Sequence, residues 1–261
     1  GTGEQGYQDA LSVCQAVAVN SGTTIENVLP FSTGVIGEPL PVEKITSAIP
    51  AALSDVNEGN WFAASEGILT TDTQPKGYST QFEFDGKTIT ISGISKGAGM
   101  IMPNMATMLG FIATDAPVEP RLLQKLCAEL TNYSFNRVTI DGDTSTNDSC
   151  MLMATASVDM DCIDSENHPA YEILKSELKK AFLYLAQAIV RDGEGATKFV
   201  SIQVSECENQ QEALRVAYTV AHSPLVKTAL YANDVNWGRI LAAVGRSGVK
   251  DMDLSKIRIY L

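Results

Sequence analysis

A single hydroxyl lies in the apolar, Met- and Gly-rich stretch GAGMIMPNMATML, which covers residues 97–109. It belongs to Thr107, and the small residue Ala106 precedes it. A threonine hydroxyl is a poor nucleophile unless a base takes its proton, and an N-terminal threonine carries such a base in its own α-amine. The unperturbed pKa of an α-amine is about 7.7–8.0, so a useful fraction is neutral at cellular pH.

Thr107 lies inside the chain, so this chemistry first requires a cut between Ala106 and Thr107. The same hydroxyl can attack the preceding carbonyl and form an ester that water then opens, and the small alanine side chain leaves room for that attack. The alternative is a buried β-branched residue with a structural role. The residue types of this stretch leave both interpretations open.

The chain has only two histidines, which limits the bases that a nucleophile can use. His168 precedes a proline in a polar segment, and His222 precedes a Ser-Pro pair. Both are predicted to be surface or capping residues rather than catalytic bases. A nucleophile in this chain therefore needs a different base.

Two glycine-containing segments can surround a reacting group. STGVIG at residues 32–37 can present backbone N–H groups that stabilise an oxyanion, or it can be a plain turn before a helix. KGAGM at residues 96–100 allows close approach to its backbone, and the ammonium of Lys96 can bind a substrate carboxylate. This segment matches neither the phosphate loop GxxxxGK[ST] nor the dinucleotide fingerprint GxGxxG.

Two further loops carry acidic residues. DGDTSTND at residues 141–148 lacks the Gly and Glu that an EF-hand needs at positions 6 and 12, so we predict an acidic loop that hydrogen-bonds itself into turns. In RDGEGATK at residues 191–198, Glu194 lies between two glycines, where it is either exposed to a ligand or part of a helix C-terminal turn. No metal site is predicted.

The composition limits the classes of function. The chain has 261 residues, of which 44% are hydrophobic and 19% charged, as expected of a globular protein. Its net charge of -12 disfavours a nucleic-acid partner, and no apolar run is long enough to predict a membrane span. The five cysteines are odd in number and form no CxxC pair, which predicts reduced thiols in a cytoplasmic setting.

Hydrophobic periodicity predicts the elements that would position these residues. Apolar residues recur at helical spacing in some segments and alternate as in strands in others. The predicted helices cover residues 7–19, 41–49, 122–130, 173–189 and 213–220, and the predicted strands lie in a hairpin at 81–92 and at 110–116, 151–160 and 198–206. Their interleaved order favours an α/β or α+β fold with layered sheets over a regular βαβ repeat.

Several segments occur in the order and at the spacing of a known family. They are FSTGVIGEPLP, TTDTQPKG, GISKGAGMIMPNMATMLGFIATDA, DGDTSTND, RDGEGATK and ANDVNWGRI. Through them the whole chain resembles the ornithine acetyltransferases, also called glutamate N-acetyltransferases, of arginine biosynthesis. The most specific of these segments is KGAGMIMPNMATML.

The resemblance implies a self-processing enzyme that is cut before Thr107, the nucleophile at the start of its second segment. The two segments are then residues 1–106 and residues 107–261. The first contains the oxyanion hole and the loop with Lys96. Thr33 and Gly34 match the oxyanion hole of the family. The positions that match substrate contacts are Thr73, Lys96, Thr107 and Glu194. Of these, Lys96 suits a substrate carboxylate and Glu194 suits an ammonium group.

The implied reaction is a ping-pong acetyl transfer without a cofactor or metal. Thr107 takes the acetyl group from N-acetylornithine, releases ornithine, and passes the acetyl group to glutamate; some family members also accept acetyl-CoA as the donor. The implied fold is an αββα-type layered sandwich with mixed sheets, and the implied assembly is a heterotetramer with two copies of each segment. The alternatives are an amidase or hydrolase with an N-terminal nucleophile and an inactive fragment.

The family's precursors are longer than this sequence at both ends. The chain is therefore expected to be trimmed upstream of Gly1 and to lack a tail after Leu261. The resemblance places an Asn and a Thr of the substrate site in that tail.

Overall fold

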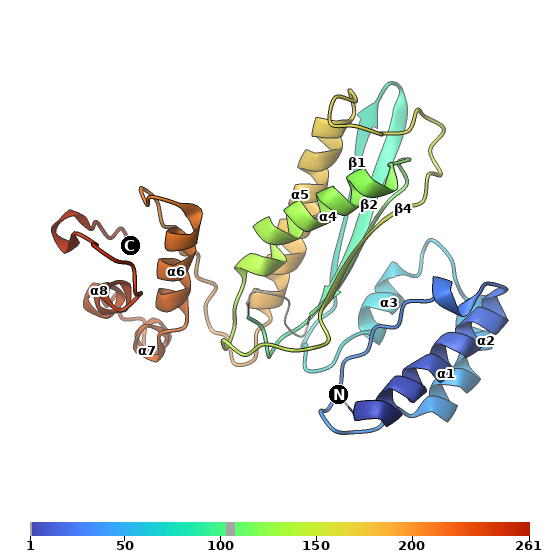
Figure 1. Ribbon diagram of the computed structural model, residues 1–261, viewed down its shortest axis with the longest axis horizontal. Coiled ribbons are helices and arrows are strands. Elements are labelled where there is room, and N and C mark those ends of the chain that lie inside the picture. The colour runs from blue at the N-terminus through green and yellow to red at the C-terminus, as the bar shows by residue number, and fades with distance from the viewer. Residues whose placement is uncertain (1, 103–107) are drawn as a thin grey trace.

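The computed structural model describes residues 2–102 and 108–261, which form a mixed α/β fold (Figure 1). Its strands are β1 (Lys76–Phe84), β2 (Lys87–Lys96), β3 (Leu109–Thr114) and β4 (Ser149–Ala154). Its α-helices are α1 (Gly3–Ser21), α2 (Val42–Ser54), α3 (Trp61–Gly67), α4 (Pro120–Tyr133), α5 (Tyr171–Arg191), α6 (Gln210–Ala221), α7 (Pro224–Tyr231) and α8 (Trp237–Gly245). Short 3-10 helices lie at Ile25–Asn27, Phe135–Arg137 and Leu254–Lys256.

The strands form one mixed sheet in the order β1-β2-β3-β4. The β1–β2 and β2–β3 pairs are antiparallel, and β3–β4 is parallel. Asp85 and Gly86 join β1 to β2 with φ values of 49° and 70°, as a two-residue hairpin turn with left-handed central residues requires. Lys96 pairs with Leu109, so the β2–β3 ladder closes at the residues that flank the 97–108 connection.

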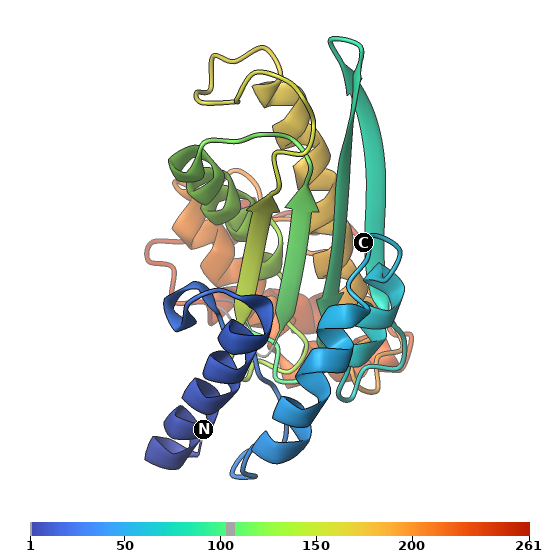
Figure 2. The ribbon, with the colours of Figure 1, turned by 90° about the vertical axis from the view of Figure 1, so that its right-hand side faces the viewer.

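A layer of two helices, α4 and α5, covers one face of this sheet (Figure 1). The core lies between the sheet and these two helices. Alternate strand residues such as Ile89, Ile91 and Ile112 are fully buried on this side. The fully buried side chains of α5 that meet this face are Leu174, Leu178, Phe182, Leu185 and Ile189. Figure 2 looks onto the opposite face of the sheet, with this helical layer behind the strands.

Gly93 marks the closest approach of α5 to the sheet. A Cβ atom at this position would lie 3.0 Å from Cγ1 of Ile112 and 3.1 Å from Cδ1 of Leu185. A larger residue would therefore push the helix away from β2 and β3, and only glycine allows the observed packing.

Two smaller helical groups flank this central unit. The group α1–α3 precedes β1, and α3 contacts β1 and β2. The group α6–α8 has a small apolar core of its own, whose buried members are Val216, Val220, Val226, Ala243 and Val244. The two groups lie at opposite sides of the molecule in Figure 1.

The structure confirms most of the predicted elements. Helices α1, α2, α4, α5 and α6 match the five predicted helical segments, although α2 begins at Val42 rather than at residue 41. The hairpin and β3 are present. Of the strand predicted at 151–160 only residues 151–154 lie in β4, and residues 155–160 form no strand. The strand prediction for residues 198–206 is wrong: the apolar alternation is real, but the segment pairs with no strand of the described chain. Helices α3, α7 and α8 have nine residues or fewer, too short for a periodicity signal.

The predicted α/β class and the mixed sheet are confirmed. The described residues contain one sheet, so the second sheet of the αββα layering stays a prediction. None of their helices is long and apolar enough to cross a membrane.

The α5 core contact gives a stability prediction. We expect Leu178→Ala, at a fully buried position, to lower the free energy of unfolding by about 2–5 kcal/mol, since it removes apolar contacts and leaves a cavity. Ile173→Ala is the matched control, because Ile173 lies on the same helix with 37% of its surface exposed, and we expect a loss of roughly 1 kcal/mol. Urea unfolding of both variants measures the difference; equal losses would contradict the assignment of the core.

Candidate active site

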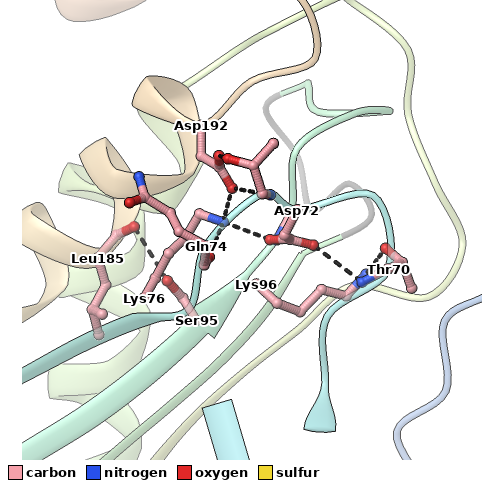
Figure 3. Close-up of polar contacts among 10 residues, drawn as sticks. Thr70, Asp72, Gln74, Lys76, Ser95, Lys96, Leu185 and Asp192 are labelled. Atoms are coloured by element: carbon pink, nitrogen blue, oxygen red, sulfur yellow. Dashed lines mark hydrogen bonds and ion pairs between the residues drawn. The ribbon is translucent and has the colours of Figure 1, made fainter. Parts of the chain in front are cut away.

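A buried cluster of charges joins the segment before β1 to the end of α5 (Figure 3). Lys76 Nζ lies 2.6 Å from a carboxylate oxygen of Asp72 and 2.6 Å from one of Asp192, and all three side chains are at most 3% exposed. The Thr73 N–H donates to Asp192 at 3.0 Å, and the Thr73 hydroxyl donates to the other oxygen of the same carboxylate. Each charge in the cluster therefore has a partner, as a buried charge requires.

These contacts set the ionisation of both carboxyl groups. Burial alone would raise the pKa of Asp72, but the hydrogen bonds from Lys76 and from the Gly97 N–H, together with the Lys76 charge, bring it below the usual value. Burial likewise acts to raise the pKa of Asp192, and the hydrogen bonds from Lys76 and Thr73 lower it. Both carboxylates are thus charged at neutral pH and hold Lys76 between them.

Lys96, at the end of β2, is a second fully buried lysine and lies beside this cluster (Figure 3). Its ammonium donates to Thr70 Oγ1 at 3.3 Å and lies beside the carboxylate of Asp72 (Figure 3). Burial lowers the pKa of Lys96, while the negative charges of Asp72 and Asp148 oppose this shift. The charges of Asp72 and Asp148 thus partly offset the burial of this ammonium.

The segment after β2, residues 97–100, is called the glycine loop here and lies between the charge cluster and Glu194. The Gly97 N–H donates to Asp72 at 2.6 Å, and the Glu194 N–H donates to the Ala98 carbonyl at 2.7 Å. The Glu194 side chain lies against Gly99, where an added Cβ would be 2.7 Å from a carboxylate oxygen. Glycine at this position allows Glu194 to lie over the loop.

Side chains of the acidic loop at residues 141–148 form hydrogen bonds with the backbone of three other segments. The Asp141 carboxylate accepts the N–H groups of Met100 and Ile101 at 2.7 and 3.1 Å. Asn147 Nδ2 donates to the Ser32 carbonyl at 2.7 Å, next to Thr33. The predicted internal turns are present as well, for example the Asp143 N–H bonded to the Asp141 side chain at 2.9 Å.

The third contact of this loop reaches the residue after Thr107. Asp148 Oδ1 accepts the N–H of Met108 at 2.7 Å. Burial raises the pKa of Asp148 to about 7, and the Met108 N–H and the charge of Lys96 act in the opposite direction. This carboxyl group therefore titrates near neutral pH beside the start of β3.

The structure brings most of the predicted site residues to one region. Thr73, Lys96 and Glu194 are linked through Asp192, Thr70 and the glycine loop as described above. The loop that holds Thr33 and Gly34 is fastened by Asn147. Ala106 and Thr107 lie outside the described residues, and the neighbour Met108 is held by Asp148.

Of the two histidines, His222 has the predicted capping role, and His168 lies in the turn before α5, whose N-cap is Ala170. His168 Nδ1 accepts the N–H of Ala170 at 3.1 Å, just before α5. His222 follows α6 as its C-cap, and Nε2 lies 3.0 Å from the Thr139 hydroxyl. No group of His, Cys, Asp and Glu in the described part of the chain could hold a metal ion. The five cysteines are free.

The sequence model of the ArgJ family matches residues 1–261. The chain belongs to the ArgJ family. Proteins named arginine biosynthesis bifunctional protein ArgJ are similar over the whole chain: that of Pseudomonas syringae pv. tomato is 60% identical and that of Pseudomonas fluorescens is 59% identical. The chain spans 64% of the length of each of these two relatives.

A solved ArgJ structure resembles this one. The crystal structure of the protein of the same name from Bacillus halodurans has 44% sequence identity and a TM-score of 0.53. The match covers 55% of this chain and 67% of the other. The sequence and the fold of this chain thus agree on membership of the ArgJ family.

Sequence reasoning missed six side chains that build this site. Asp72, Lys76 and Asp192 lie inside the quoted segments TTDTQPKG and RDGEGATK, and Asp141, Asn147 and Asp148 lie inside DGDTSTND. A local signal was present in TTDTQPKG, where Asp72 directly precedes the predicted contact residue Thr73. The partners of the six side chains are up to 119 residues away, which periodicity and local motifs do not encode.

The charge cluster gives a second prediction. We expect Lys76→Met to lower the free energy of unfolding by about 3–5 kcal/mol, since it leaves two buried carboxylates without their shared cation. Lys125→Met is the matched control, because Lys125 pairs with Glu166 at the surface, where we expect a loss of about 0–1 kcal/mol. Chemical denaturation measures both; a Lys76→Met variant as stable as the control would refute the role of the cluster.

Proposed function

We propose that this chain carries the self-cleaving nucleophile and part of the substrate site of an ornithine acetyltransferase. The observation that carries the proposal is the set of hydrogen bonds from loop 141–148, which connects the Thr33–Gly34 segment, the glycine loop and Met108. Membership of the ArgJ family supports the same function, since its relatives are named for arginine biosynthesis.

The first chemical step of the proposal is a cut between Ala106 and Thr107. The Thr107 hydroxyl attacks the Ala106 carbonyl, the peptide bond becomes an ester, and water hydrolyses the ester. The products are residues 1–106 and residues 107–261, and the second begins with a free α-amine. That amine then serves as the base that the histidines of this chain do not supply.

The second step is the transfer itself. The Thr107 hydroxyl attacks the acetyl carbonyl of N-acetylornithine, its proton passes through the α-amine to the departing ornithine nitrogen, and the acetyl ester remains. The amine of glutamate attacks the ester and leaves as N-acetylglutamate, which restores the hydroxyl. Backbone N–H groups at Thr33 and Gly34 would stabilise the oxyanion of each tetrahedral intermediate.

The described residues have the chemistry that these substrates need. Lys96 offers a buried ammonium, which suits a substrate carboxylate. Glu194 is exposed beside the glycine loop and suits an ammonium group. The Thr73 hydroxyl donates a hydrogen bond to Asp192, so its oxygen presents an acceptor lone pair to a substrate N–H.

We propose that no cofactor takes part in either step and that acetyl-CoA is an alternative acetyl donor. Two copies of each segment would form a heterotetramer in the cytoplasm.

The cut can be tested by the intact mass of the full-length protein. We expect wild type to appear as two chains, with the second beginning at Thr107, and to gain one acetyl group on that chain with N-acetylornithine. Thr107→Ala removes the attacking hydroxyl and should stay uncut and unacetylated, whereas Thr88→Ala, on the exposed hairpin, should behave as wild type. Uncut wild-type protein, or cutting in Thr107→Ala, would rule out the proposed cleavage.

The acceptor separates a transferase from a hydrolase of similar chemistry. A transferase should release ornithine continuously only when glutamate is present, because the acetyl ester otherwise accumulates after one turnover. Ornithine release is measured with and without glutamate, and aspartate serves as the control acceptor. Continuous release without any amino-acid acceptor would show that water is the acceptor and would contradict transfer.

A further inference from the structure

Both backbone polar groups of Met108 are held by residues 148–149. The Met108 N–H donates to Asp148 Oδ1 at 2.7 Å, and the Met108 carbonyl accepts the N–H of Ser149 at 3.1 Å. Met108 is buried, and the parallel β3–β4 ladder begins at the next residue, with Leu109 opposite Ser149. The position of the residue after Thr107 is therefore fixed from two sides.

The other oxygen of the same carboxylate has no partner in the described chain. Asp148 Oδ2 is buried and accepts no hydrogen bond from a described residue. A buried carboxylate oxygen without a donor is costly, and native structures leave few of them. This oxygen therefore indicates a donor that belongs to the functional state of the site.

The covalent structure limits which donor is near. The Met108 nitrogen is bonded to the carbonyl carbon of Thr107, so the α-nitrogen of Thr107 is three bonds away from the atom that Asp148 already binds. After a cut before Thr107, that nitrogen carries hydrogens that can point to a carboxylate. When it takes the proton of the hydroxyl it becomes an ammonium, which a nearby carboxylate stabilises.

We propose that Asp148 is the positioning residue of the nucleophile: Oδ1 holds the Thr107–Met108 peptide, and Oδ2 accepts a hydrogen bond from the α-ammonium of Thr107. The role corresponds to that of the carboxylate that orients and stabilises the base in a catalytic triad. The inference rests on the proposed function, since it assigns a role around the same nucleophile.

The charges that face Asp148 allow this role near neutral pH. Lys96, at the end of β2, is the cation that acts on it, and Lys96 is in turn influenced by Asp72 and Lys76. Burial keeps the pKa of Asp148 at about 7, so the carboxylate form grows as the pH rises through that value. The acetylation rate should therefore fall as the pH drops below about 7, because the protonated carboxyl cannot stabilise an ammonium.

The test compares Asp148→Asn with Asp143→Asn in the full-length protein. Asp148→Asn keeps an oxygen that can accept the Met108 N–H but removes the charge, and Asp143 is an exposed residue of the same loop. We measure acetyl-Thr107 formation by intact mass from pH 5.5 to 9. In Asp148→Asn we expect kcat to fall by about 100-fold with KM within about twofold. The acid limb that Asp148 contributes near pH 7 should disappear, which leaves only the limb that belongs to the α-amine. Asp143→Asn should match wild type.

The outcomes separate this inference from the function on which it rests. A cut and acetylated Asp148→Asn variant with the rate and pH profile of Asp143→Asn would overturn the role of Asp148 and leave the acetyltransferase intact. Wild type without acetylation on Thr107 would overturn both. Asp148→Ala adds a check on folding: a loss of rate in Asp148→Asn at an unchanged melting temperature supports positioning, and a rate loss only where the protein unfolds refutes it.

Discussion

The ammonium of Lys76 between the carboxylates of Asp72 and Asp192 is the contact on which the candidate site depends. It ties the segment before β1 to the end of α5, and through Asp72 it also holds the first N–H of the glycine loop. Because all three charges are buried, the loss of Lys76 would leave both carboxylates without a cation. The positions of Lys96 and Glu194 follow from this fixed point.

Loop 141–148 has a different role, because it holds backbone rather than charge. Its carboxylates and its amide each bind a main-chain group of another segment. Hydrogen bonds of this kind do not depend on the side chains of the partners, so they fix where those segments run and leave their side chains free for chemistry. Such an acidic loop is easily taken for a solvated surface turn, which is how its composition alone would describe it.

Local patterns predicted the elements well and the connections between them poorly. The 3.6-residue spacing in α5 and the Asp85–Gly86 turn are properties of neighbouring residues, and the structure contains both. The segment 198–206 alternates as a strand does, yet a strand also needs a partner, which alternation cannot supply. Thr73, Lys96 and Glu194 are site residues that the family resemblance implies, and their roles stay predictions. The residues that bring them together, Asp192 and Asp148 above all, act over long sequence distances that only the folded chain reveals.

The β2–β3 ladder bears on whether the chain folds before it is cut. Its paired residues, from Ile91 opposite Thr114 to Lys96 opposite Leu109, lie on either side of the Ala106–Thr107 bond. The contact between residues 76 and 192 spans this bond as well, and contacts of such separation form late, once loop-closure entropy has been overcome. If the proposed self-cleavage needs the assembled site, the cut would occur only after the chain has folded. The cut chain would then stay one cooperative body, because the pairing of β2 with β3 joins the two segments.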